Sequence, residues 1–219
     1  MSDVENTSST MSTDGEAAAP VRKRPKPGER RVQILQALAS MLEQPGAERI
    51  TTAALAAKLE VSEAALYRHF ASKAQMFEGL IEFIEQTVFS LVNQIVERDG
   101  AATDPAAGVR QAGKIVAMLV QFAEKNPGMT RVMVGDALVF ENERLQQRMN
   151  QFFDKIESTL KQCLRDGPAA GGSATPSVDA QVGASVLTAF AVGRLQRFAR
   201  SGFRRLPSEH LEASLAQML

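Results

Sequence analysis

Apolar residues recur along this chain with the spacing of α-helices, and this periodicity limits the protein to a helical fold. The longest regular stripe lies in residues 73–98, where apolar positions three and four apart would share one helix face. No segment shows the strict alternation of apolar and polar residues that a half-buried strand requires. We therefore predict an all-α protein of about nine helices, at 29–42, 52–59, 63–69, 73–98, 109–125, 130–137, 139–165, 178–201 and 208–218.

The formal net charge of zero conceals three stretches of different charge. Residues 1–21 carry four acidic side chains and no basic one, and they hold too few apolar groups to become ordered. Residues 22–31 carry a net charge of +5, and the other 188 residues sum to −1. The basic stretch directly precedes the first predicted helix, which favours an arm that contacts phosphates over a merely solubilising tail.

The composition excludes several classes of protein. Cys163 is the single cysteine, so no internal disulfide framework is available. Because the chain has neither an apolar run of about 18 residues nor a signal-peptide pattern, we expect a cytoplasmic protein without a membrane span. The two histidines and the cysteine lack metal-ligand spacing, and the common nucleotide-binding and hydrolase motifs are missing. We therefore expect neither a cofactor nor an enzymatic activity.

Residues 51–73 have the pattern of a helix-turn-helix unit, in which a tight turn joins two short helices. We expect Thr52 to cap the first helix and Ser62 the second, while Ser72 and the residue three positions later have the spacing of a capping box. Small and polar side chains on the outward face of the second helix would enter a DNA major groove; these are Glu63, Ala64, Tyr67 and Arg68. The spacing alone fits a plain helical hairpin equally well.

The same block resembles the TetR family of DNA-binding regulators, through Ala56, Val61-Ser62, Leu66-Tyr67, His69-Phe70 and Ser72-Lys73. The resemblance implies an N-terminal three-helix DNA-binding domain, followed by a bundle of about six helices. It also implies that residues 62–68 read bases while hydroxyl, imidazole and ammonium groups contact the DNA backbone. The expected DNA contacts are Thr51, Thr52, Ser62, Glu63, Ala64, Ala65, Tyr67, Arg68, His69 and Lys73. For His69, the alternative is a half-buried ring packed beside Phe70.

Glu60 departs from the family pattern, which has glycine in the turn between the two short helices. A residue with a Cβ atom at positive φ costs on the order of 1 kcal/mol relative to glycine. Either the turn of this chain has a different geometry, or it tolerates the strain.

Residues 49–70, 67–86 and 125–157 resemble the nucleoid occlusion branch of the TetR family, most specifically in the strings NPGMTR and ALVFENERLQ. This resemblance implies a homodimer that binds palindromic chromosomal sites, and it leaves open whether higher-order assembly of several dimers occurs on the DNA. It further implies that the bound protein inhibits assembly of FtsZ, the tubulin-like division GTPase, by binding the C-terminal tail of FtsZ. Such a protein would lie in the cytoplasm at the nucleoid and coordinate cell division with chromosome segregation.

An exposed aromatic side chain marks a candidate site for the FtsZ tail. Phe83 lies about 120° from the centre of the apolar stripe of its helix, so its ring should face solvent. The alternative is a Phe83 that packs against the DNA-binding domain or a neighbouring helix. Lys125 stands where the family usually has arginine, so it lacks the planar fork for bidentate contact. We expect a groove for an extended peptide, lined by Phe83, Met118, Gln121, Lys125 and Asn126.

Dimerisation is expected through the 178–201 helix and the C-terminal helix. Small residues there would let a second copy approach closely, namely Ala180, Gly183, Ala184 and Gly193. Four arginines near the end of the longer helix are interpreted as solvated charge, namely Arg194, Arg197, Arg200 and Arg204. The predicted organisation is a disordered acidic tail and basic arm at 1–28, a helix-turn-helix DNA-binding domain at 29–72, and a helical partner-binding and dimerisation domain at 73–219.

Two other functions fit the same fold. A one-component transcriptional repressor would respond to a small ligand, and it would need a buried pocket with a few convergent polar groups. A helical adaptor that binds only proteins would lack the salt-dependent affinity for a palindromic duplex that phosphate contacts produce.

Overall fold

The computed structural model describes residues 28–44, 50–99, 104, 106–165 and 174–219. In this part of the chain every regular element is a helix, so the predicted all-α fold is confirmed. The acidic tail, residues 22–27 of the basic arm, and parts of the loops at 100–108 and 167–176 lie outside the described residues. The elements in chain order are α1 (Glu29–Leu42), α2 (Thr52–Lys58), α3 (Glu63–Tyr67), α4 (Lys73–Asp99), α5 (Ala107–Lys125), α6 (Pro127–Met133), the short 3₁₀ helix η2 (Asp136–Leu138), α7 (Glu143–Arg165), α8 (Pro176–Arg200) and α9 (Leu211–Met218).

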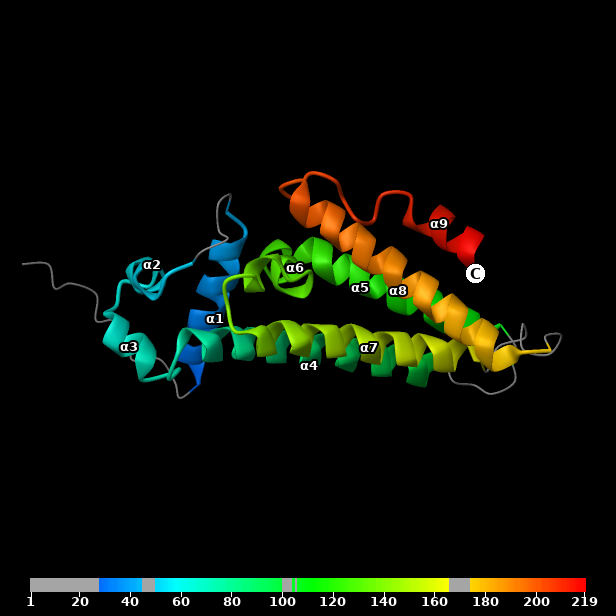
Figure 1. Cartoon of the computed structure of the whole chain (residues 1–219), viewed down its shortest axis with the longest axis horizontal. Helices are drawn as coiled ribbons and strands as arrows, with labels where there is room; N and C mark the ends of the chain where they lie inside the picture. Colours follow the sequence, from blue (N-terminus) through cyan, green and yellow to red (C-terminus); the bar gives the residue numbers. More distant parts are fainter. Residues whose placement is uncertain (1–27, 45–49, 100–103, 105, 166–173) are drawn as a thin grey trace, which may run out of the picture.

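The helices form an elongated molecule with a small N-terminal unit at one end (Figure 1). α1, α2 and α3 make up this unit, and α4 begins beside it and runs along the body. Within the body, α7 and α8 form the most extensive helix pair, and α5 packs against α4, α7 and α8. The chain then turns back so that α9 lies alongside α8. None of the described helices is long and apolar enough to cross a membrane.

α4 carries its predicted apolar stripe into the core of the body. Phe77, Ile84 and Val88 are each at most 1% exposed. Phe152 of α7 is fully buried and packs edge-to-face on Phe89, with ring centroids 5.4 Å apart. The helical spacing therefore predicted the buried face of α4 correctly, and burial of these large side chains holds α4 against α7.

Five of the predicted helices begin two to four residues from their expected starts. α5 and α8 each begin two residues earlier, at Ala107 and Pro176, and α9 begins three residues later, at Leu211. α6 begins at Pro127 and not near residue 130, because proline ends α5 and is also well suited to the first position of the next helix. Gly135 then adopts positive φ, so the expected 130–137 helix is divided into α6 and η2. α7 begins at Glu143 and not at residue 139, because the side-chain oxygen of Asn142 accepts a hydrogen bond from the N–H of Arg144 at 2.9 Å.

Two contacts fix the N-terminal unit and α4 against the body. Gly128 of α6 touches the backbone of α1, where a Cβ atom would lie only 2.0 Å from the carbonyl oxygen of Ala39. Arg148 of α7 makes a two-pronged ion pair with Glu85 of α4, at 2.6 and 3.2 Å. The Glu85 carboxylate raises the pKa of the Arg148 guanidinium above its ordinary value, so this arginine stays charged.

Candidate nucleic-acid interface and partner surfaces

α2 and α3 form the predicted helix-turn-helix unit, with one correction at its first cap. Thr51, not Thr52, is the N-cap of α2, and its hydroxyl oxygen accepts a hydrogen bond from the N–H of Ala54 at 3.1 Å. Thr51 has the extended backbone of a cap residue, so Thr52 is the first residue of the helix. Ser62 caps α3 as predicted, because its hydroxyl oxygen accepts from the N–H of Ala65 at 3.3 Å.

The predicted capping box at the start of α4 is confirmed at Ser72, whereas the side chain of Gln75 reaches back to the residue before Ser72. The N–H of Gln75 donates to Ser72 Oγ at 3.2 Å, and Gln75 Oε1 accepts from the N–H of Ala71 at 2.9 Å. These bonds satisfy two backbone donors at the helix start and so fix the position at which Lys73 enters α4.

The turn between α2 and α3 keeps a left-handed residue without using glycine. Glu60 has a φ of 53°. The N–H of Glu60 donates to Ala57 O at 3.1 Å, and that of Val61 donates to Ala56 O at 3.0 Å, which are the two bonds of a Schellman motif. The sequence left two alternatives open, a different turn geometry or a tolerated strain. Because Glu60 keeps positive φ, the second alternative holds and the turn tolerates the strain.

Replacing Glu60 by glycine is expected to raise the free energy of unfolding by up to about 1 kcal/mol. Glycine relieves the strain of positive φ, although its flexibility in the unfolded chain offsets part of the gain. Chemical denaturation of Glu60→Gly beside Glu60→Ala measures this, because alanine removes the same side chain but keeps the strained φ. A glycine variant no more stable than the alanine variant would contradict the interpretation.

Three of the expected DNA contacts form one hydrogen-bonded chain on the surface of the helix-turn-helix unit. Thr52 Oγ1 donates to Glu63 Oε2 at 2.6 Å, and the Tyr67 hydroxyl donates to Thr52 Oγ1 at 3.5 Å. Glu63 and Tyr67 are exposed, and Thr52 is half-buried. Because Glu63 begins α3 and Tyr67 ends it, this chain of bonds ties α2 to both ends of α3 and orients hydroxyl groups of the kind that contact phosphates.

Beside this hydrogen-bonded chain, the surface of α3 carries small side chains that do not project far from the helix backbone. Ala64 is exposed and Ala65 is half-buried, and neither projects beyond a methyl group. A helix surface with such small side chains can lie close to base edges in a major groove. Arg68, which follows α3 directly, is exposed and supplies a positive charge at the same surface.

The end of the basic arm contacts the segment after α3. The Arg31 guanidinium donates to the backbone oxygen of His69 and lies 4.1 Å from the centre of the Phe70 ring. His69 is half-buried there, which agrees with both of the roles considered for it. Arg31, the last residue of the basic stretch, therefore lies on the same surface as the helix-turn-helix unit.

Lys73 has a partner that the sequence did not reveal. Its Nζ atom lies 2.5 Å from Oε1 of Glu141, and the Glu141 side chain is only 10% exposed. Glu141 belongs to the loop between η2 and α7, so this ion pair joins the start of α4 to the body. A DNA phosphate that binds Lys73 would have to compete with a carboxylate already in place.

The candidate peptide groove lies on α4 and α5, which pack against each other. Phe83 of α4 is 46% exposed, so its predicted exposure is confirmed. From α5, Gln121 and Lys125 are exposed and Met118 is half-buried. Asn126 is half-buried, and its side-chain amide donates to a backbone oxygen of the last turn of α5 at 2.8 Å. That these five residues line one groove stays a prediction.

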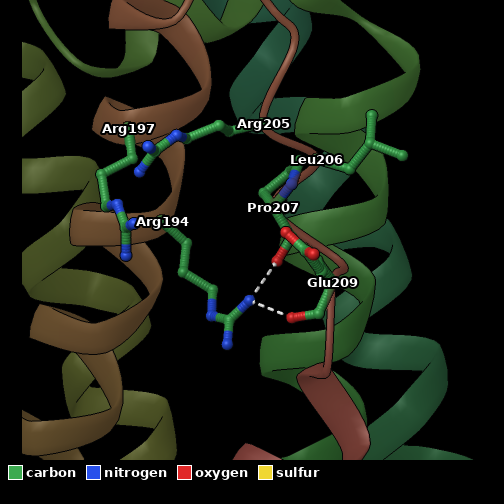
Figure 2. A pocket seen from close by; sticks show the side chains of 6 residues that line it. All are labelled: Arg194, Arg197, Arg205, Leu206, Pro207 and Glu209. Atoms are coloured by element: carbon green, nitrogen blue, oxygen red, sulfur yellow. Dashed lines mark hydrogen bonds between the residues drawn. The ribbon is translucent and has the colours of Figure 1, made fainter.

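A cavity of about 320 Å³ lies at the C-terminal end of α8, between this helix and the segment that leads to α9 (Figure 2). Arg194 is not the solvated charge that was expected: it is half-buried and donates to Pro207 O at 3.0 Å and to Ser214 Oγ at 2.9 Å. It therefore anchors the segment between α8 and α9. Because Arg197 and Arg205 line the cavity and are exposed, it is a hollow in the surface and not the buried pocket of a ligand-responsive repressor.

α8 exposes a row of valines to solvent. Val178, Val182 and Val186 are 58%, 57% and 49% exposed. Their spacing of four residues puts all three on one face of the helix. An exposed apolar row of this kind is typical of a surface that packs against another protein.

Three small residues of α8 do not lie on this exposed face, contrary to the role expected for them. Ala180 and Ala184 are 4% and 0% exposed within the single chain. A Cβ atom on Gly183 would lie 3.0 Å from Leu164 of α7, so this glycine serves the contact between α7 and α8. At Gly193 no described atom lies within 4 Å of such a Cβ, so of the four small residues this one faces open space.

A helix-turn-helix unit joined by one long helix to a helical body defines a DNA-binding protein of the TetR class. Residues 34–80 match the family model of bacterial regulatory proteins of the tetR family, and residues 108–219 match the SlmA-like model of tetracyclin repressor-like C-terminal domains. The chain is 50% identical over 184 residues to the nucleoid occlusion factor SlmA of Idiomarina loihiensis and to that of Vibrio cholerae, which covers 84% of this chain and 90% of each relative. The chain belongs to the family of nucleoid occlusion factors SlmA.

Solved structures of TetR regulators share the fold. The fatty acid degradation regulator FadR from Bacillus halodurans aligns with a TM-score of 0.68 at 15% identity, covering 90% of this chain and 96% of its own. The TetR family regulator PfmR from Thermus thermophilus aligns with a TM-score of 0.64 at 21% identity, covering 85% and 97%. At these identities the likeness supports the architecture alone.

Proposed function

We propose that this protein binds palindromic chromosomal sites as a symmetric dimer and, while bound, inhibits assembly of the FtsZ ring over the nucleoid. It thereby coordinates cell division with chromosome segregation, and it acts in the cytoplasm at the nucleoid. The observation that carries the proposal is the 50% identity with nucleoid occlusion factors, which extends over 90% of the relative from Vibrio cholerae.

The chemistry of the helix-turn-helix surface supports DNA binding. It offers the hydroxyls of Thr51, Thr52 and Tyr67 together with the positive charge of Arg68, and Lys73 adds a second charge where a phosphate displaces Glu141. Hydroxyl and cationic groups are the side chains that most often contact phosphate oxygens and so set the register of a protein on its duplex. In that register, the surface of α3 with its small side chains faces the base edges.

The exposed valines of α8 support a dimer. A two-fold axis that packs this row against a second copy would remove it from water, and the same symmetry matches the symmetry of a palindromic site. Recognition helices related by this axis would enter successive major grooves about 34–36 Å apart.

The exposed ring of Phe83 supports a peptide-binding surface on α4 and α5. A large aromatic side chain that is nearly half exposed in a single chain is a typical anchor for a partner. Lys125, which is exposed at the end of α5, adds a positive charge that would attract an acidic peptide. We therefore place the FtsZ tail across Phe83, Met118, Gln121, Lys125 and Asn126.

Replacing Phe83 by alanine is expected to weaken binding of the FtsZ C-terminal tail peptide at least tenfold. An aromatic anchor that becomes buried when the peptide binds contributes about 1.4 kcal/mol or more to the interface. The measurement is a titration of a fluorescent FtsZ tail peptide with protein bound to a palindromic duplex. Light scattering by FtsZ with GTP follows the same variant, which should no longer suppress assembly.

Phe140→Ala is the matched control, because this phenylalanine is 67% exposed in the loop before α7, outside the candidate groove. It should bind the peptide as the unchanged protein does, and both variants should keep their affinity for DNA. Unchanged peptide affinity in Phe83→Ala would overturn the location of the groove. Failure of the unchanged protein to bind the peptide at all would overturn the proposed partner.

A further inference from the structure

We propose that Glu63 reads the amino group of a cytosine in the major groove, and that Thr52 positions the carboxylate for this contact. This inference rests on the proposed DNA-binding function, which by itself names no base. It gives the recognition surface one specific base and assigns Thr52 a role beyond contact with the DNA backbone.

Glu63 occupies the position from which a recognition helix reads DNA. It is the first residue of α3, and the N-terminal residues of such helices are those that reach base edges. Its side chain is exposed, and the alanine that follows it leaves room for a close approach. The hydroxyl of Thr52 donates to Oε2 of Glu63 at 2.6 Å, which restricts the carboxylate to one orientation before any DNA arrives.

A fixed carboxylate on this surface requires a hydrogen-bond donor from the DNA. Next to phosphates, a negative charge lowers the affinity unless it accepts a hydrogen bond that compensates for the repulsion. Base pairs offer two donors in the major groove, the N4 amino group of cytosine and the N6 amino group of adenine. Adenine also presents its N7 acceptor beside the amino group, which repels a carboxylate, whereas cytosine presents no acceptor on that side. Cytosine is therefore the base that a glutamate at this position favours.

The test is selection of bound duplexes from a randomised pool, with the full-length protein, Glu63→Gln and Glu63→Ala compared at one salt concentration. The unchanged protein should enrich a palindrome with one position in each half-site that requires cytosine. At this position Glu63→Gln should change the preference to adenine, because a glutamine amide pairs with both N6 and N7 of adenine. Glu63→Ala should lose the preference. A duplex with cytosine replaced there should bind the unchanged protein about tenfold more weakly, and Glu63→Ala less than twofold more weakly.

Glu60→Gln is the matched control, because it removes the same charge from an exposed residue in the turn before α3. It should enrich the same sites as the unchanged protein, which separates base reading from a general effect of charge. Circular dichroism shows whether each variant keeps its helices. If the unchanged protein enriches a palindrome and both Glu63 variants enrich the same one, the inference is overturned and the proposed function stands. If the unchanged protein enriches no palindrome, the proposed function itself is overturned.

Discussion

Replacing Gly128 by alanine is expected to destabilise the protein by about 3 kcal/mol, at the upper end of the usual cost of overpacking. The new Cβ atom would lie 2.0 Å from the carbonyl oxygen and 2.9 Å from the carbonyl carbon of Ala39. These are backbone atoms of α1, so no side-chain rotation can relieve the clash, and α1 and α6 must separate. Alanine is the better helix former by up to about 1 kcal/mol, so a loss of stability reports the lost contact and not helix propensity.

The measurement is the midpoint of thermal or urea unfolding, followed by titration with a palindromic duplex. α1 belongs to the N-terminal unit and α6 to the body, so the variant should also bind DNA more weakly as the unit loses its fixed orientation. Gly113→Ala is the control, because its Cβ would meet only the terminal methyl group of Leu219 at 3.2 Å. It should be neutral or slightly stabilising. Equal stability of Gly128→Ala and the unchanged protein would contradict the close approach of α1 and α6.

The helices of this protein were predictable because their buried faces repeat along the sequence. The stripe in α4 indicated both the helix and its buried side, and the helical angle of Phe83 indicated its exposure. The capping box at Ser72 and Gln75 was equally visible, since its partners are three residues apart. Interactions of this kind are local, so residue order alone contains them.

Contacts between distant residues left no such pattern. The ion pair of Lys73 with Glu141 joins residues 68 positions apart, and nothing in either neighbourhood indicates the other. The close approach of Gly128 to α1 is hidden for the same reason, because one glycine in a helix has no periodic signal. The link between Thr52 and Glu63 depends on how α2 crosses α3, which the turn at Glu60 sets.

α8 shows where composition misled the prediction. Small residues suggested a close contact between two copies of the chain, but Gly183 serves the contact with α7 and Ala184 is buried within the single chain. Small side chains permit close helix packing wherever it occurs, within a chain or between chains. The exposed valines are the better marker of a partner.

Replacing both Val182 and Val186 by glutamate is expected to give a folded monomer that binds a palindromic duplex about 100-fold or more weakly. Both side chains are already exposed, 57% and 49%, so charges there should leave the single chain stable. In a dimer the same charges would be removed from water and brought near their copies, which opposes association. The affinity falls because one protein would then hold only one half-site, and the advantage of two linked contacts is lost.

Light scattering at micromolar concentration gives the mass, and titrations with a full palindrome and with a single half-site give the two affinities. The half-site affinity should be equal in the variant and the unchanged protein, since the helix-turn-helix surface is untouched. Val139→Glu is the control for mass, because this valine is 69% exposed in the loop before α7 and lies outside the exposed row of α8. It should remain a dimer. A double variant that keeps the dimer mass would show that the two copies meet through another face, and the exposed valines of α8 would then need a different partner.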